Sequence, residues 1–422
     1  MLRRLTALAI AGVAAQPEDA FSGQAQSGST AGDRKRGLLI GGLLGDALGG
    51  PIEFSESPSR YDVTCNARGW MDDETLSDMR LAELASSLVL TDYESLRPEP
   101  APYGQWLRNA PAGTVTDDSR HKIILVDALR AASQSGRRPT REDLARAFLD
   151  FAPEPDRFNT QVSTLCEEGL QEYRYAARWL LGERDLDVAR PLERLWAGVN
   201  NCSGQMLLPP LAVCHAGQPE AAYRAAYELD FIDSPIARDI AAAVVAGLAA
   251  VLDPVLDSSN PSDRWQLLLG TMQRVDPFRY QDVPFAGRQL DRWMRLARDL
   301  AKQAGGSPKR LYSLLESEGR PVFWWDAHFT LLVPLSMLHL CDFHPLAALH
   351  LTLDFGHDTD SYAQLLCCMI GAVHGEQIFP EPMRAAVTKS VRNEYSVDLV
   401  EWMNVLNASA SLPALKNGTG SR

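Results

Sequence analysis

The sequence has little of what several common classes of protein require. Its seven cysteines include no pair spaced as Cys-x-x-Cys, which argues against a zinc knuckle and against a thioredoxin-type redox pair. The chain has 41 basic and 54 acidic side chains, and its formal net charge of -13 argues against non-specific electrostatic binding of nucleic acid. No run is both long enough and free enough of charge to span a bilayer. We therefore expect no nucleic-acid partner and no stable membrane anchor.

The patterns that are present are mainly helical. Hydrophobic residues make up 45% of the chain and charged residues 23%, so a sizeable core can be buried. Alternating strand patterns with hairpin turns are scarce, whereas apolar residues recur at helical spacing in several segments. These segments are 141–151, 235–253, 289–303 and 326–340. We predict an all-α fold with one domain over residues 37–412, in which the adjacent Cys367 and Cys368 are small buried hydrophobes.

The two ends of the chain differ from this central part. Residues 1–4 are basic and residues 5–15 are apolar, ending in small residues that could form a cleavage site. Residues 16–36 are rich in Ser, Gly, Gln and Ala. We therefore predict a signal-like or disordered leader over 1–36, a flexible tail over 413–422, and a periplasmic or secreted protein. The alternative is a cytoplasmic chain with a frayed start, which the odd number of cysteines favours.

Three short segments combine glycine with oxygen-bearing side chains. Residues 37–54 read GLLIGGLLGDALGGPIEF, where small residues would let a helix pack closely on its neighbours and Glu53 would follow on a turn. Residues 113–119 read GTVTDDS and precede an apolar helical pattern, so Thr116, Asp117 and Asp118 fall at a helix N-terminus. Residues 354–361 read DFGHDTDS and again precede an apolar helix. Capping of the two helices is one explanation of the acidic residues.

The second explanation is a metal centre. One residue caps a helix, and three adjacent oxygen side chains exceed that need. Four carboxylates around one cleft would repel each other, and divalent cations relieve that repulsion most simply. Carboxylates and hydroxyls are hard ligands that suit Mg²⁺ or Mn²⁺ rather than zinc. Two ions about 3.5–4 Å apart could share such ligands.

The same segments, in this order and at this spacing, resemble the ADP-ribosylglycohydrolase family. The resemblance rests on GDALGGPIEF at 45–54, TDDS at 116–119 and GHDTDSYAQLLCCMIGAVHG at 356–375. It continues through residues 203–234 and the GEQIFPEP at 375–382. The family includes the dinitrogenase reductase-activating glycohydrolase and the ADP-ribosyl-arginine and ADP-ribosyl-serine hydrolases. The resemblance implies a compact orthogonal helical bundle whose cleft holds a binuclear centre of Mg²⁺ or Mn²⁺, with two ions per chain.

The resemblance also implies a site and a reaction. The metal ligands would be Thr116, Asp117, Asp118, Asp358, Asp360 and Ser361. The reaction would be hydrolysis of the glycosidic bond at the anomeric carbon of ADP-ribose attached to a protein side chain or to a small conjugate. Glu53 matches the family's glutamate beside the metals, and Glu53, Asp117 and Asp358 are all candidates for the carboxylate that activates water. The linkage (arginine, serine or another) and the choice between Mg²⁺ and Mn²⁺ stay open, and no pattern predicts an oligomeric state.

Some positions depart from the family pattern and keep two alternatives open. His357 stands where the family usually has glycine, Leu207 where it has arginine, and Ile232-Asp233 where it has a Thr-His pair. One alternative is a non-catalytic, crystallin-like relative, although all the expected ligand types are present here. The other is a metal-assisted hydrolase of a different nucleotide or phosphate ester. For His357 we favour a neutral, hydrogen-bonded turn residue over a catalytic one.

Overall fold

The described structure is helical throughout. The computed structural model describes residues 29–53, 75–90, 111–151 and 160–412. Within these ranges there is no β-strand, and two residues, Asn201 and Asp326, form an isolated bridge. The all-α prediction is therefore confirmed. No helix in the described ranges is long and apolar enough to cross a membrane. The first 28 residues and the predicted tail at 413–422 lie outside the described residues.

The α-helices agree closely with the sequence patterns. They are α1 (Ala31–Gly49), α2 (Asp78–Ser86), α3 (Asp117–Gln134), α4 (Arg141–Asp150), α5 (Thr160–Leu180), α6 (Ser203–Leu207), α7 (Leu211–Cys214), α8 (Pro219–Leu229), α9 (Pro235–Val251), α10 (Pro261–Arg274), α11 (Gln289–Ala304), α12 (Pro308–Gly319), α13 (Ala327–Leu340), α14 (Pro345–Phe355), α15 (Thr359–His374), α16 (Glu381–Tyr395) and α17 (Leu399–Ala410). Short 3₁₀ segments connect some of them: η2 (Gly50–Ile52), η4 (Leu192–Gly198), η5 (Pro254–Leu256), η6 (Tyr280–Asp282) and η7 (Glu376–Ile378). The four helices expected from periodicity correspond to α4, α9, α11 and α13.

The start of α1 corrects the predicted leader. Residues 31–36, expected to be disordered, form the first turns of this helix. Thr30 and Asp33 make a capping box, in which each side chain accepts from the other residue's backbone N–H. The Arg34 side chain is fully buried and donates to the backbone oxygens of Val251 and Asp253. Composition suggested a linker here, but the capping pair and these distant acceptors order the segment.

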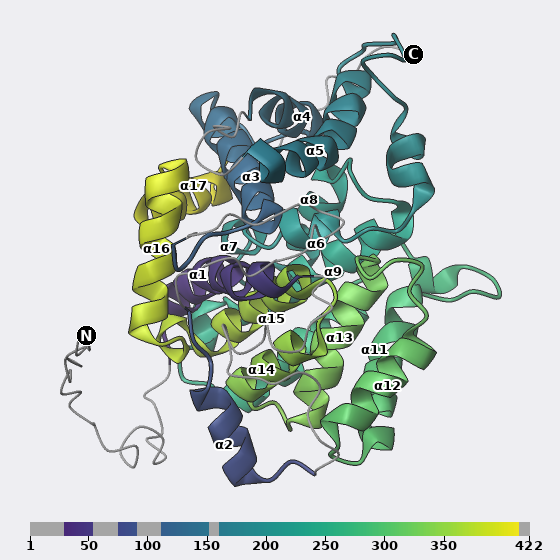
Figure 1. The fold of residues 1–422 in the computed structure, drawn as a ribbon. Helices are drawn as coiled ribbons and strands as arrows, with labels where there is room; N and C mark the ends of the chain where they lie inside the picture. Colours follow the sequence, from purple (N-terminus) through teal and green to yellow (C-terminus); the bar gives the residue numbers. More distant parts are fainter. Residues whose placement is uncertain (1–28, 54–74, 91–110, 152–159, 413–422) are drawn as a thin grey trace, which may run out of the picture.

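Helices α1 and α15 lie against each other near the middle of the molecule (Figure 1). Four glycines, spaced four residues apart on α1, face the α15 backbone. A Cβ atom added at Gly37, Gly41, Gly45 or Gly49 would lie 2.2–2.4 Å from a backbone atom of residues 360–371. Real Cβ atoms do not approach that closely, so these positions require glycine. The close contact brings the C-terminal end of α1 to the N-terminal end of α15, where Thr359 Oγ1 donates to Gly49 O over 2.8 Å.

The remaining helices surround this pair. In Figure 1, α16 and α17 lie on one side of α1 and α15 and α11 and α12 on the opposite side, while α3, α4 and α5 lie above the pair in this view. Helices α9 and α13 are buried along nearly their whole length, as the apolar residues on every face of α9 predicted. Cys367 and Cys368 are fully buried in α15, which confirms their predicted role as core residues.

Candidate metal centre

The first acidic turn, residues 116–118, begins helix α3. Thr116 is its N-cap, and its Oγ1 accepts from Asp118 N at 3.2 Å. The buried carboxylate of Asp46, on α1, accepts from the backbone N–H groups of Thr116 and Ser119, both at 2.9 Å, and from the Ser119 hydroxyl. Asp46 therefore satisfies helix donors that Asp117 and Asp118 would otherwise serve, and leaves their carboxylates available.

The second acidic turn, residues 358–361, begins helix α15. Asp358 is at the N-cap position, but its side chain makes no capping hydrogen bond. Asp360 Oδ1 accepts from Ser361 N at 2.9 Å, and Ser361 Oγ donates to Asp118 Oδ2 at 3.3 Å. Capping thus accounts for Thr116 but not for Asp358. The Ser361–Asp118 hydrogen bond joins the two acidic turns, although more than 200 residues separate them in the sequence.

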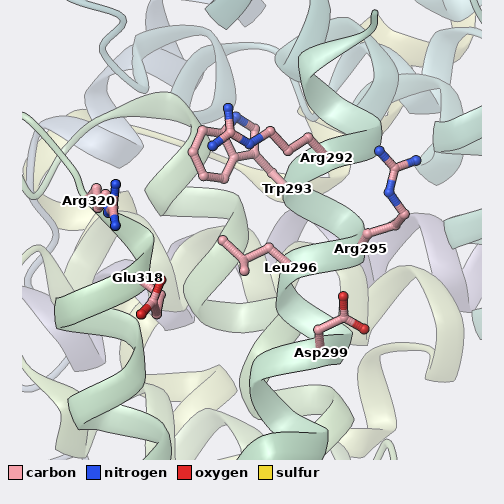
Figure 2. A pocket seen from close by; sticks show the side chains of 7 residues that line it. All are labelled: Arg292, Trp293, Arg295, Leu296, Asp299, Glu318 and Arg320. Atoms are coloured by element: carbon pink, nitrogen blue, oxygen red, sulfur yellow. The ribbon is translucent and has the colours of Figure 1, made fainter.

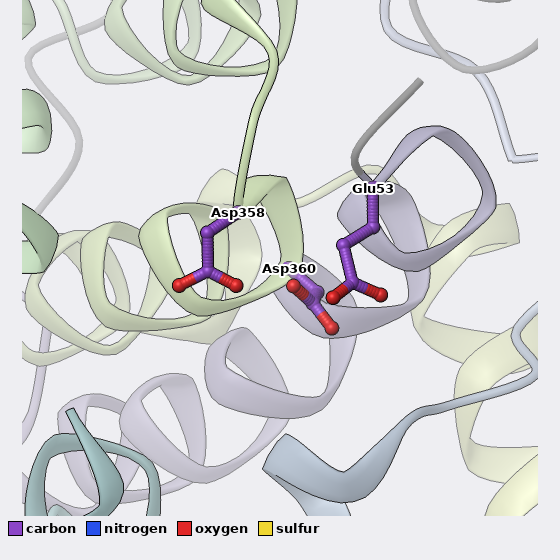
Figure 3. A group of neighbouring side chains, drawn as sticks. All are labelled: Glu53, Asp358 and Asp360. Carbon is purple, nitrogen blue, oxygen red and sulfur yellow. The ribbon is translucent and has the colours of Figure 1, made fainter. Parts of the chain in front are cut away.

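Two groups of carboxylates gather at this junction. Glu53, Asp358 and Asp360 each have an oxygen within 4.8 Å of the others, and Figure 3 shows the three side chains converging, Glu53 from the end of η2 and the two aspartates from the start of α15. Asp117, Asp118 and Asp360 form a second group with the same spacing. Asp360 belongs to both groups. The predicted site residues are therefore brought together, in an arrangement that could hold metal ions.

The electrostatics of these carboxylate groups favour a bound cation. Burial, followed by the charge of Glu53, raises the pKa of Asp358 and of Asp360 well above the usual range. Burial also raises the pKa of Asp118 well above that range, with the charge of Asp46 adding to the rise. A divalent cation among these groups would stabilise their charged forms, because it supplies the missing positive charge.

The donor set fits a hard cation. Asp118 Oδ1 is buried and has no hydrogen-bond partner in the structure. An orphaned buried carboxylate oxygen costs free energy unless a ligand or water occupies the space next to it. The nearest buried cation, Lys122, is directed elsewhere: its Nζ donates to the backbone oxygen of Asp118 at 3.0 Å. Oxygen atoms of this kind suit Mg²⁺ or Mn²⁺.

Three residues of this site were not predicted from the sequence. Asp46, on α1, and Lys122, on α3, form hydrogen bonds with the first acidic turn. Asp46 lies within the glycine-rich segment 37–54, which is the only indication of its role that the sequence offered. Cys202, just before α6, places its buried Sγ 3.6 Å from Ser361 Oγ and 4.0 Å from Asp358 Oδ2. Nothing in the local sequence indicated this thiol, because its neighbours in space come from α15.

His357 supports the second acidic turn from outside the cleft. It has a positive φ of 64°, and its ring stacks on Trp324 with centroids 3.6 Å apart. Its Nε2 lies 3.2 Å from Glu316 Oε1. Burial lowers the pKa of His357, against the opposing effect of Glu316. These contacts agree with the predicted role as a neutral, hydrogen-bonded turn residue.

A surface pocket between α11 and α12 is separate from these carboxylates. It is lined by Arg292, Trp293, Arg295, Leu296, Asp299, Glu318 and Arg320 (Figure 2). None of these residues belongs to either acidic turn. The pocket is therefore not part of the candidate metal centre, whose two carboxylate groups come from the two acidic turns and Glu53.

Comparison with known proteins agrees with this geometry. A search of curated proteins finds no match to the chain. The family model described as ADP-ribosylglycohydrolase matches residues 27–413, nearly the whole sequence. The match spans both acidic turns and Glu53, and it begins before α1, consistent with the earlier start of the folded part. The chain therefore belongs to the ADP-ribosylglycohydrolase family.

Proposed function

We propose that this protein is a metal-dependent hydrolase that cleaves the glycosidic bond at the anomeric carbon of ADP-ribose, attached to a protein side chain or to a small conjugate. Two Mg²⁺ or Mn²⁺ ions per chain would bind between the acidic turns. The observation that carries the proposal is the pair of carboxylate groups that share Asp360. Membership of a glycohydrolase family supports the reaction class.

The proposed metal ligands are the oxygen side chains of the two acidic turns. They are Thr116, Asp117, Asp118, Asp358, Asp360 and Ser361, with Glu53 beside them. Bound divalent cations would polarise a water molecule or a substrate oxygen and hold the ribose hydroxyls. The chain itself would orient the sugar within the cleft, so that the anomeric carbon faces a carboxylate.

Cleavage of the bond builds positive oxocarbenium character on the sugar, which nearby carboxylates stabilise. A carboxylate must also accept a proton from the attacking water. Glu53, Asp117 and Asp358 remain the candidates for this base. Glu53 differs from the other two because it lies past the end of η2 and is only partly buried, so it can reorient without disturbing a helix N-terminus.

The first experiment measures ADP-ribose release from arginine-linked and serine-linked substrates with Mg²⁺, with Mn²⁺ and with chelator. Release that requires metal is the expected result, and the better substrate identifies the linkage. No release with bound metal, together with hydrolysis of a phosphate ester, would instead establish the alternative metal-assisted reaction. Absence of both activities and of metal binding would leave a non-catalytic family member.

The base can be assigned by comparing Glu53→Gln, Asp117→Asn and Asp358→Asn. Calorimetric titration with Mn²⁺ separates the residues that hold metal from the residue that accepts the proton. The base is the residue whose variant retains metal affinity but has strongly reduced turnover. The residual turnover of that variant should no longer fall at acidic pH. Loss of metal affinity in all three would mean that the proton acceptor lies elsewhere.

A further inference from the structure

A second pair of buried carboxyl groups lies outside the metal ligands, in the turn between α8 and α9. Asp230 is fully buried and Asp233 is 7% exposed. Asp230 Oδ1 accepts from the backbone N–H groups of Ile232 at 3.0 Å and of Asp233 at 3.1 Å. Asp233 Oδ2 accepts from Gly204 N, on α6, at 3.0 Å. The other oxygen of each group, Asp230 Oδ2 and Asp233 Oδ1, is buried with no hydrogen-bond partner in the structure.

The two carboxyl groups lie side by side over Gly204. A Cβ atom added to this glycine would lie 2.4 Å from Asp233 Oδ2 and 2.8 Å from Asp230 Oδ2. Two ionised carboxylates this close in a buried site repel each other strongly, and carboxyl groups in such pairs retain one proton between them. A single proton would also give the orphaned oxygens a donor and an acceptor.

Two arginines whose charges reach this pair donate their hydrogen bonds to backbone oxygens and not to the two carboxyl groups. From α9, Arg238 donates its Nη2 to the backbone oxygen of Asp233 at 3.0 Å, and its charge acts on both acids. From α4, the charge of Arg141 also reaches Asp230, while its guanidinium donates to backbone oxygens at the end of α8. From α5, the Tyr173 hydroxyl is hydrogen-bonded to Ser203 Oγ, and burial raises its pKa well above the usual range, so it adds no charge near Asp233. Burial raises the pKa of both acids, and the charge of Asp230 raises that of Asp233 further.

This pair contacts α6, which lies beside the second acidic turn. Gly204, its hydrogen-bond partner, is the second residue of α6. Cys202, immediately before α6, contacts Asp358 and Ser361 of the second acidic turn. In the middle of α6, Gln205 O accepts from Gln364 Nε2 of α15 at 3.2 Å. The hydrogen bond that Asp233 accepts is therefore one of the contacts that hold α6 beside the second acidic turn.

We infer that Asp230 and Asp233 share one proton at neutral pH, with Asp233 as the protonated partner, and that this hydrogen-bonded pair is a positioning element for α6. Its bearing on catalysis rests on the proposed function of the neighbouring cleft, whereas the shared proton does not. Loss of that proton at high pH leaves two facing carboxylates, whose repulsion loosens the contact with Gly204.

The shared proton is tested by comparing the wild type with Asp233→Asn. The asparagine retains an acceptor for Gly204 N–H and a donor for Asp230 but has no proton to lose. The folded wild-type pair holds a proton that the unfolded chain, with an aspartate pKa of about 3.9, has released at neutral pH. The wild type therefore loses stability as pH rises above about 4, up to the folded pKa. Relative to the variant, its unfolding constant should rise about tenfold per pH unit between pH 5 and 7.

Urea unfolding at several pH values, with Mg²⁺ present, measures this difference. Glu228→Gln is the matched control, because it removes an exposed carboxylate from the adjacent helix α8. Its free energy of unfolding should change with pH as steeply as that of the wild type. Asp230→Asn is the second variant and should reduce the slope in the same way. If the free energy of unfolding changes with pH equally steeply in the wild type and in both asparagine variants, Asp230 and Asp233 do not share a proton.

Hydrogen exchange at the Gly204 amide tests the positioning role. After correction for intrinsic rates, protection of this amide should fall at alkaline pH in the wild type and stay constant in Asp233→Asn. Asp233→Leu should lose the protection at every pH, because it removes the acceptor. Unchanged protection in Asp233→Leu would overturn the role of the pair in holding α6. None of these measurements needs a substrate, so failure of the hydrolase proposal would leave their result unaffected.

Discussion

At the scale of single residues, neighbouring carboxyl groups serve different purposes. Asp46 accepts hydrogen bonds from three donor groups and holds the first acidic turn, whereas Asp118 keeps one buried oxygen without a partner. Asp360 contributes to both groups of carboxylates, and Thr116 caps a helix while lying beside them. The distinction between a structural acid and a ligand acid therefore depends on which donors surround each side chain.

Asp360→Asn should reduce ADP-ribose release at least about a hundredfold, because it weakens both groups of proposed ligands. Without metal, the variant should be at least as stable as the wild type, since it removes one of several repelling charges. An assay of ADP-ribose release measures the first effect, and thermal unfolding with and without Mn²⁺, followed by circular dichroism, measures the second. The exposed Asp187→Asn serves as the control. Full activity in Asp360→Asn would remove the binuclear interpretation.

Asp46→Ala should lower the free energy of unfolding by about 2 kcal/mol, because two backbone N–H groups and the Ser119 hydroxyl lose their acceptor. Metal affinity should fall about 10–100-fold, as expected of a group that positions ligands. Urea denaturation and calorimetric metal titration test the two expectations separately. Reduced stability with unchanged metal affinity would limit Asp46 to helix capping.

At the scale of elements, the contact between α1 and α15 determines how the carboxylates of the candidate metal centre are arranged. Glycine at every fourth position of α1 removes side chains that would separate the two backbones. This close packing places Glu53, which follows α1 and η2, next to Asp360. Helix α3 is joined to the pair by Asp46, and α6 by Cys202.

Gly45→Ala should cost at least about 3 kcal/mol, because its Cβ atom would lie 2.2 Å from the backbone oxygen of Ala363. Gly32→Ala, in the first turn of the same helix, meets no atom closer than 3.6 Å and should gain up to about 1 kcal/mol from helix propensity. Chemical denaturation of the two variants compares them directly. Similar stabilities would contradict the close packing of α1 on α15.

At the scale of the whole molecule, the acidic sequence encloses several buried groups whose charge changes with pH. His350, on α14, is 3% exposed, and its Nδ1 lies 2.7 Å from Ser87 Oγ. Burial lowers the pKa of His350 to about 4. Protonation of this ring is therefore coupled to unfolding of the surrounding core.

The contribution of His350 to stability should be fully present above about pH 6.5, the usual pKa of an unfolded histidine, and should be lost as pH falls towards 4. The loss is up to about 1.4 kcal/mol per pH unit, because the unfolded chain binds a proton that the folded chain excludes. In His350→Gln this part of the slope should be absent. Urea unfolding at pH 7.5, 6.5 and 5.5 should show the stability gap between wild type and variant closing as pH falls. A constant gap would mean that His350 has the same pKa in the folded and the unfolded protein, so that its burial does not lower the pKa.

Short-range features of the fold were predictable from the sequence. Apolar spacing predicted α4, α9, α11 and α13, and the glycines of residues 37–50 predicted close helix packing. These signals are local, because helical periodicity and capping involve residues at most a few positions apart. The leader boundary was placed too late for the same reason: composition indicated a linker, and the distant acceptors of Arg34 were invisible in the sequence.

The sequence by itself determined the all-α class, the two acidic turns and the residue types of the candidate site. Only the tertiary structure decided which of these residues meet. The convergence of Glu53 on Asp360, the contact of Cys202 with Asp358 and the pairing of Asp230 and Asp233 over Gly204 all join segments that local patterns treat separately. Their proximity results from helix packing, which fixes distances through space that sequence separation does not encode.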